Sequence, residues 1–129
     1  DATYLYTEPS SVIGLWWALE DTTIENGCLW AWPGGHREAV RSRFIRNADN
    51  TVSYALLNDT PWPEDKFVPL EVPKGTLLLF GGNLPHGSHP NRSDHSRHAY
   101  SLHVIDGTKP YPATNWLQRD PALPLRGFK

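Results

Sequence analysis

The sequence predicts a mainly β protein, an antiparallel sandwich or barrel with little helix. Twelve prolines and ten glycines divide the 129 residues into short pieces, and no helical stripe of apolar residues persists for long. Between these breaks the chain is rich in β-branched and aromatic residues, which is typical of short strands joined by turns. The length fits a single domain that spans residues 1–129.

Seven strands are expected in chain order, separated by turn signals such as Asn26-Gly27 and Pro73-Lys74-Gly75, because Asn and Gly accept positive φ. Helix is expected only in small pieces, for example at residues 37–41. Residues 58–66 are expected to form a loop, and the proline-rich tail after Gly107 to wrap the surface. The expected strands are residues 12–19, 28–32, 43–46, 52–57, 67–72, 76–80 and 98–105.

Composition excludes several classes of function. A net charge of -2 leaves no basic patch for nucleic acid and no strong attraction to anionic lipid. No apolar run is long enough for a membrane span. Cys28 is the single cysteine, so it cannot form an internal disulfide and is most simply a small buried hydrophobe. We therefore expect an intracellular, cytoplasmic protein with no nucleic-acid or membrane partner.

The segment 98–105 alternates clearly, so Ala99, Ser101 and His103 share one face of a strand. Arg97 has the same parity, and if the small residues mark a barrel interior, its guanidinium enters the barrel mouth. A buried cation needs an anionic partner, and a planar carboxylate suits the guanidinium best. His86 lies eleven residues earlier, and Ser88 could add a hydroxyl donor to the same anion.

Several short strings, taken in order, resemble the phytanoyl-CoA dioxygenase family. Each string alone is weak, whereas the ordered set is specific, and the similarity runs from Asp1 to about Leu117. The strings are Asp1-Ala2 with residues 6–9 (YTEP), residues 15–21 (LWWALED), 25–30 (ENGCLW), 33–36 (PGGH), and 86–88 (HGS) with Arg97.

The resemblance implies a cupin-like jelly-roll barrel, a double-stranded β-helix, that holds iron(II) by two histidines and one carboxylate and leaves positions open for 2-oxoglutarate and O2. On this resemblance Asp1 and His86 are metal ligands. Arg97 grips the far carboxylate of 2-oxoglutarate and Ser88 assists it. Trp16 lines the cosubstrate site, with Trp17 as the alternative.

The remaining histidines are assigned separately. His36 is expected to line the substrate pocket by family analogy, while His103 is expected to be an interior, hydrogen-bonded side chain rather than a ligand. His98 should point the opposite way from Arg97. The resemblance also implies a first histidine ligand two residues before Asp1. That residue is absent and the chain contains no methionine, so we expect an N-terminally truncated barrel.

The predicted function is hydroxylation of a small organic substrate, with release of succinate and CO2, by an iron(II)- and 2-oxoglutarate-dependent dioxygenase. Two alternatives remain open. The first is a catalytically inactive jelly-roll binding module, which would tolerate loss of the first histidine. The second is a cupin-like isomerase or hydrolase with another metal. The sequence does not identify the substrate.

Overall fold

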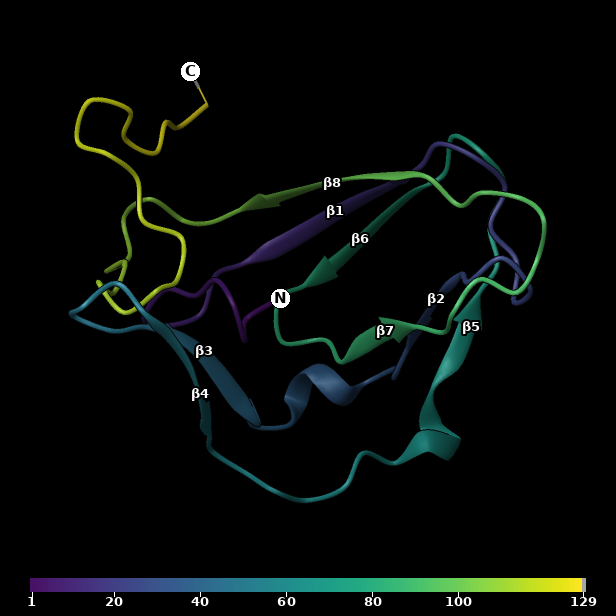
Figure 1. Cartoon of the computed structure of the whole chain (residues 1–129), viewed down its shortest axis with the longest axis horizontal. Helices are drawn as coiled ribbons and strands as arrows, with labels where there is room; N and C mark the ends of the chain where they lie inside the picture. The colour runs from purple at the N-terminus through teal and green to yellow at the C-terminus, as the bar shows by residue number, and fades with distance from the viewer. Residues whose placement is uncertain (129) are drawn as a thin grey trace.

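The computed structural model describes residues 1–128, and almost all of its regular structure is short antiparallel strands (Figure 1). Only two single-turn 3-10 helices interrupt the strands. The elements are β1 (Ile13–Ala18), β2 (Leu29–Ala31), η1 (Gly35–Arg37), β3 (Ser42–Arg46), β4 (Val52–Leu56), η2 (Glu64–Lys66), β5 (Val68–Leu70), β6 (Leu77–Gly81), β7 (His86–Ser88) and β8 (Ala99–Val104).

The strands form three small sheets, with the orders β6-β1-β8, β5-β2-β7 and β3-β4. From β5 to β8 the chain alternates between the first two sheets, since β5 and β7 pair with β2 whereas β6 and β8 pair with β1. Figure 1 shows β8, β1 and β6 side by side, with the β2 sheet and the β3–β4 hairpin below them. This alternation encloses a space between the sheets.

The hydrophobic core is small and lies where β1 meets β2. Trp16, Ala18 and Leu29 are buried there. Partly buried side chains pack against them, namely Leu70, Val72, Leu78, Phe80 and Ala99. Cys28 is fully buried beside this core, as expected for a small apolar side chain. The core thus joins the two larger sheets at one end of the space between them.

All seven predicted strands are present, with ends that differ by at most two residues. The three-residue strand β7 was not predicted. The prediction of a helix at residues 37–41 is wrong. A single 3-10 turn ends at Arg37, and Glu38 is extended, with φ of -75° and ψ of 154°. Gly34 turns the chain at a φ of 82°, and too few residues follow to nucleate a helix.

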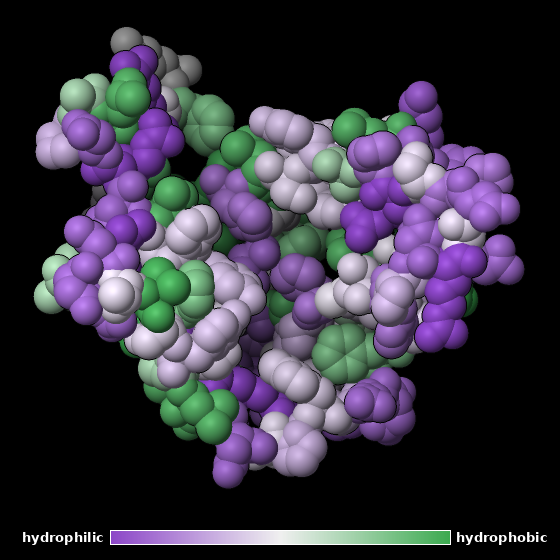
Figure 2. Space-filling view, in the orientation of Figure 1, coloured by the Kyte–Doolittle hydropathy of each residue, from purple (hydrophilic) through white to green (hydrophobic). Residues whose placement is uncertain are grey.

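None of the helices in residues 1–128 has the length and apolar character needed to span a membrane. Figure 2 shows a hollow near the middle of the face drawn there, with hydrophilic side chains in its depth. A cavity of about 730 Å³ lies in this part of the fold.

Candidate metal and cosubstrate site

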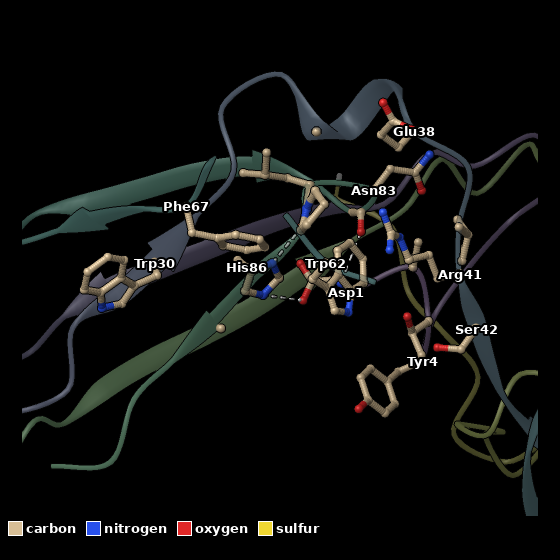
Figure 3. A pocket seen from close by; sticks show the side chains of 18 of the residues that line it. Asp1, Tyr4, Trp30, Glu38, Arg41, Ser42, Trp62, Phe67, Asn83 and His86 are labelled. Carbon is tan, nitrogen blue, oxygen red and sulfur yellow. Dashed lines mark hydrogen bonds and ion pairs between the residues drawn. The ribbon is translucent and has the colours of Figure 1, made fainter. Parts of the chain in front are cut away.

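Backbone hydrogen bonds hold Asp1 beside the end of β6. Its α-amine donates to the carbonyl of Gly82 at 3.1 Å, and the N–H of Ala2 donates to the same oxygen at 2.8 Å. The carbonyl of Asp1 accepts from the N–H groups of Tyr4 and Leu5, at 2.8 and 3.1 Å. These four bonds fix the residue so that its carboxylate, only 13% exposed, faces the cavity (Figure 3).

Because Gly14 has no side chain, the carboxylate of Asp1 can occupy the space beside β1. A Cβ at Gly14 would lie 2.6 Å from Oδ2 of Asp1 and 2.9 Å from a ring carbon of Phe80. A glycine inside a strand often marks the close approach of another group. This signal was present in the sequence, but it was not used to find the site.

His86 lies opposite Asp1 at the start of β7. Its Nε2 is 3.5 Å from Oδ1 of Asp1, and its Nδ1 is 2.9 Å from the carbonyl oxygen of Leu84. A carbonyl only accepts, so Nδ1 carries the hydrogen and Nε2 keeps its lone pair. Burial lowers the pKa of His86 and favours this neutral form, although the hydrogen bond to Leu84 opposes the shift. Two acceptors therefore face each other.

A cation between these acceptors would satisfy both. Oδ2 of Asp1 is buried and has no hydrogen-bond partner in the described chain, and a buried carboxylate oxygen without a partner is unfavourable. Neutral imidazole and carboxylate are both ligands of iron(II), so these residues fit that ion. Within residues 1–128 no group of three His, Cys, Asp or Glu side chains converges as a complete centre. The chain thus presents two of the three ligands expected.

His103, on β8, orients the carboxylate from the other side. Its Nε2 lies 3.0 Å from Oδ1 of Asp1. Because the carboxylate accepts, this nitrogen donates its hydrogen. Burial, and next the charge of the nearby α-amine, lower the pKa of His103. The side chain therefore makes the predicted hydrogen bond and supports Asp1, but at 37% exposure it is not the interior residue that was expected.

A second cluster lies on the same side of the fold. Nη2 of Arg97 is 3.4 Å from Oγ of Ser88, and its Nε donates to the carbonyl of Gly27 at 3.0 Å. The guanidinium carbon lies 5.7 Å from the ring centroid of the buried Trp16. No carboxylate in residues 1–128 forms an ion pair with Arg97, and Asp94 is not its partner. The cluster therefore offers a cation and a hydroxyl to an anion.

The structure thus brings Asp1 and His86 together, and separately Arg97, Ser88 and Trp16. Strand β7 connects the two groups, because His86 and Ser88 are two residues apart and share a face. By contrast, His98 lies away from both groups and contacts Glu20, with 3.1 Å between Nδ1 and Oε2.

The 730 Å³ cavity begins at Asp1, His86 and Ser88 and extends towards aromatic side chains. His36 is exposed and lies outside its lining, in a shallower hollow with Asn83. The substrate role of His36 stays a prediction. The cavity wall also includes residues that the sequence did not single out, namely Tyr4, Trp30, Arg41, Tyr54, Trp62 and Phe67.

Comparison with known proteins shows the family and the fold of the chain. The family model described as phytanoyl-CoA dioxygenase (PhyH) matches residues 1–99. Phytanoyl-CoA dioxygenase domain-containing protein 1 of Mus musculus is 48% identical over 97% of this chain and 44% of its own length. A phytanoyl-CoA dioxygenase of Arabidopsis thaliana is 47% identical over 92% of this chain and 42% of its own length. The chain therefore spans less than half the length of these relatives.

Among solved structures, EvdO2 from Micromonospora carbonacea var. aurantiaca, complexed with 2-oxoglutarate, superposes with a TM-score of 0.60 and 26% identity. The match covers 84% of this chain and 44% of that one. This likeness confirms the predicted mainly β, cupin-like jelly-roll fold. On the family match and on the identity to its relatives, the chain belongs to the phytanoyl-CoA dioxygenase family.

Proposed function

We propose that this chain forms the metal- and cosubstrate-binding part of an iron(II)- and 2-oxoglutarate-dependent dioxygenase that hydroxylates a small organic substrate. The observation that carries the proposal is the facing pair of acceptors, Oδ1 of Asp1 and Nε2 of His86, 3.5 Å apart beside a buried carboxylate oxygen without a partner. The 2-oxoglutarate complex of the structural neighbour supports the choice of cosubstrate.

When bound, iron(II) activates O2, and the overall reaction converts 2-oxoglutarate, O2 and a substrate C–H bond into succinate, CO2 and a hydroxyl group. The role of this chain's residues is to bind and orient the metal ion and 2-oxoglutarate. The lone pair of His86 and the carboxylate of Asp1 would hold the ion, and His103 keeps that carboxylate in place by its hydrogen bond. Arg97 pairs with the far carboxylate of 2-oxoglutarate and Ser88 donates its hydroxyl hydrogen.

The test is an anaerobic titration of this chain with iron(II) and 2-oxoglutarate, followed by the visible charge-transfer absorption of the chelate. We expect a band that is lost in His86→Ala and in Arg97→Ala. The matched controls are His95→Ala and Arg92→Ala, since both residues are exposed and lie outside the two clusters. A band that persists in His86→Ala would contradict the ligand assignment.

The second candidate is a binding module without catalysis, since no group of three metal-ligating side chains converges within residues 1–128. The two proposals separate in a chain extended by His-X ahead of Asp1. A band that appears only in the extended chain assigns the defect to the third ligand. If both chains give no band, the non-catalytic function is the better account.

A further inference from the structure

Arg41 is a buried cation at the wall of the cavity that also contains Asp1 and His86. Only 9% of its surface is exposed. Throughout residues 1–128, no aspartate or glutamate forms an ion pair with it. A buried charge without a counter-ion is strongly unfavourable. The site is therefore suited to a ligand that brings the missing negative charge.

The surroundings of the guanidinium leave donors free. Its carbon lies 3.9 Å from the ring centroid of Trp62, so one face is stacked. Nη1 donates to the carbonyl of Thr60, and Nε is buried without a partner. A guanidinium has five N–H donors, and a neutral carbonyl satisfies one of them here. The stacking and the single bond fix the orientation of the guanidinium without neutralising it.

The buried side-chain atoms without a partner belong to residues that line one cavity. In the described chain, three buried side-chain atoms lack a hydrogen-bond partner: Oδ2 of Asp1, Nε1 of Trp30 and Nε of Arg41. All three residues line the same cavity, and all three are labelled in Figure 3. Oδ2 of Asp1 belongs to the carboxylate that would hold the metal of the proposed function. The N–H donors of Trp30 and Arg41 have no acceptor among the described residues, so a ligand in the cavity could bond to them.

A purely structural role does not require the charge of Arg41. The loop that follows β4 is already tied to its backbone, because the carbonyl of Arg41 accepts from the N–H groups of Leu57 and Asn58 at 2.8 and 3.1 Å. A neutral side chain of similar length would make the same contact with Thr60. The packing of the Arg41 side chain therefore does not require its positive charge.

We propose that Arg41 binds the carboxylate of an organic acid, which is the substrate of the proposed dioxygenase, so this inference rests on that function. The cavity, about 730 Å³, has the size of a small-molecule site. Aromatic rings of Tyr54, Trp62 and Phe67 line it and suit an apolar body. The acid is bound at Arg41, and the C–H bond to be hydroxylated lies towards Asp1 and His86.

The charges of the cavity wall favour a carboxylate over a phosphate. Glu38 and Glu64 also line the cavity, and both are exposed. With Asp1 they give three carboxylates against the single guanidinium of Arg41 within the lining described. A phosphate dianion would meet this negative field with one cation, whereas a carboxylate is singly charged and fits the guanidinium in a bidentate manner.

The test uses the metal-free chain, so it does not depend on iron or 2-oxoglutarate. Isothermal titration calorimetry compares 3-phenylpropionate with 3-phenylpropanamide, which has the same shape and no charge. We expect the acid to bind about tenfold more tightly or better. Arg41→Gln should reduce this preference to less than about twofold, and Arg41→Lys should restore part of it. Arg92→Gln, at an exposed arginine outside the cavity lining, is the matched control and should keep the preference.

Three results would overturn the proposal. Equal binding of acid and amide to the unmodified chain, or binding of neither, excludes a carboxylate site at Arg41. A preference that survives in Arg41→Gln but disappears in Arg97→Gln places the acid at Arg97 instead. Tighter binding of inorganic phosphate than of the acid contradicts the choice of carboxylate. If the titration with iron(II) and 2-oxoglutarate gives no charge-transfer band while the preference for the acid is intact, the dioxygenase function is refuted. The carboxylate site at Arg41 is then retained.

Discussion

Gly14→Ala tests whether the space beside β1 is reserved for the carboxylate of Asp1. The added Cβ would lie 2.6 Å from Oδ2 and 2.9 Å from Phe80, against 3.4 Å for an ordinary contact, which leaves overlaps of 0.8 and 0.5 Å. Overpacking of this kind costs about 1–3 kcal/mol, whereas alanine gains roughly 0.5–1 kcal/mol over glycine within a strand. We expect a net destabilisation of about 1–2 kcal/mol, or a fall in Tm of about 4–8 °C.

Thermal unfolding followed by circular dichroism measures this change. Gly81→Ala is the matched control, since Gly81 is also a strand residue and nothing lies within 4 Å of its Cβ. Its Tm should stay the same or rise slightly. The cost of Gly14→Ala should also shrink in an Asp1→Ala background, because one of the two clashes is then removed. A Gly14→Ala protein as stable as Gly81→Ala would refute the packing argument.

Two further predictions concern neighbouring interactions. His103→Ala removes the 3.0 Å hydrogen bond to Asp1 and should weaken iron(II) binding roughly 10- to 100-fold; an unchanged affinity in anaerobic titration would show that Asp1 needs no support. The His98 backbone N–H, followed by the Ser96 hydroxyl and the His98 ring, lowers the pKa of Glu20 to about 2. This stabilisation exists above the ordinary pKa of 4.5 and is lost as pH falls towards about 2. Glu20→Gln should therefore lower the urea midpoint near neutral pH but not near pH 2, and an equal loss at both would contradict this linkage.

The strand pattern could be predicted because its signals are local. Asn26-Gly27 marked a turn, and Gly27 does adopt a positive φ of 86°. Alternation along residues 98–105 placed His103 on the interior face with Arg97, and in the structure His103 contacts Asp1 while Arg97 lies over Trp16. Side-chain parity within one strand survives folding, because it depends on the backbone alone.

The pairing of distant segments could not be predicted from local sequence signals. Strand β7 is three residues long and contains a glycine, so it has no periodicity of its own, and it exists because β2 pairs with it. Arg41 lay in a segment predicted as helix, and its burial follows from the later loop that contributes Thr60 and Trp62. Neither property is encoded in the neighbouring residues of the chain.

Strand β7 also explains why the two proposed binding clusters keep a fixed spacing. His86 faces Asp1 and Ser88 faces Arg97, and two residues along a strand span roughly 7 Å. Backbone pairing with Leu29 and Ala31 on β2 holds both ends of β7, while β2 belongs to the core through Leu29. A short dicarboxylate anchored at a metal by one end would reach the arginine with the other. The separation of these groups is therefore set by hydrogen bonds between strands rather than by the side chains that would touch the ligand.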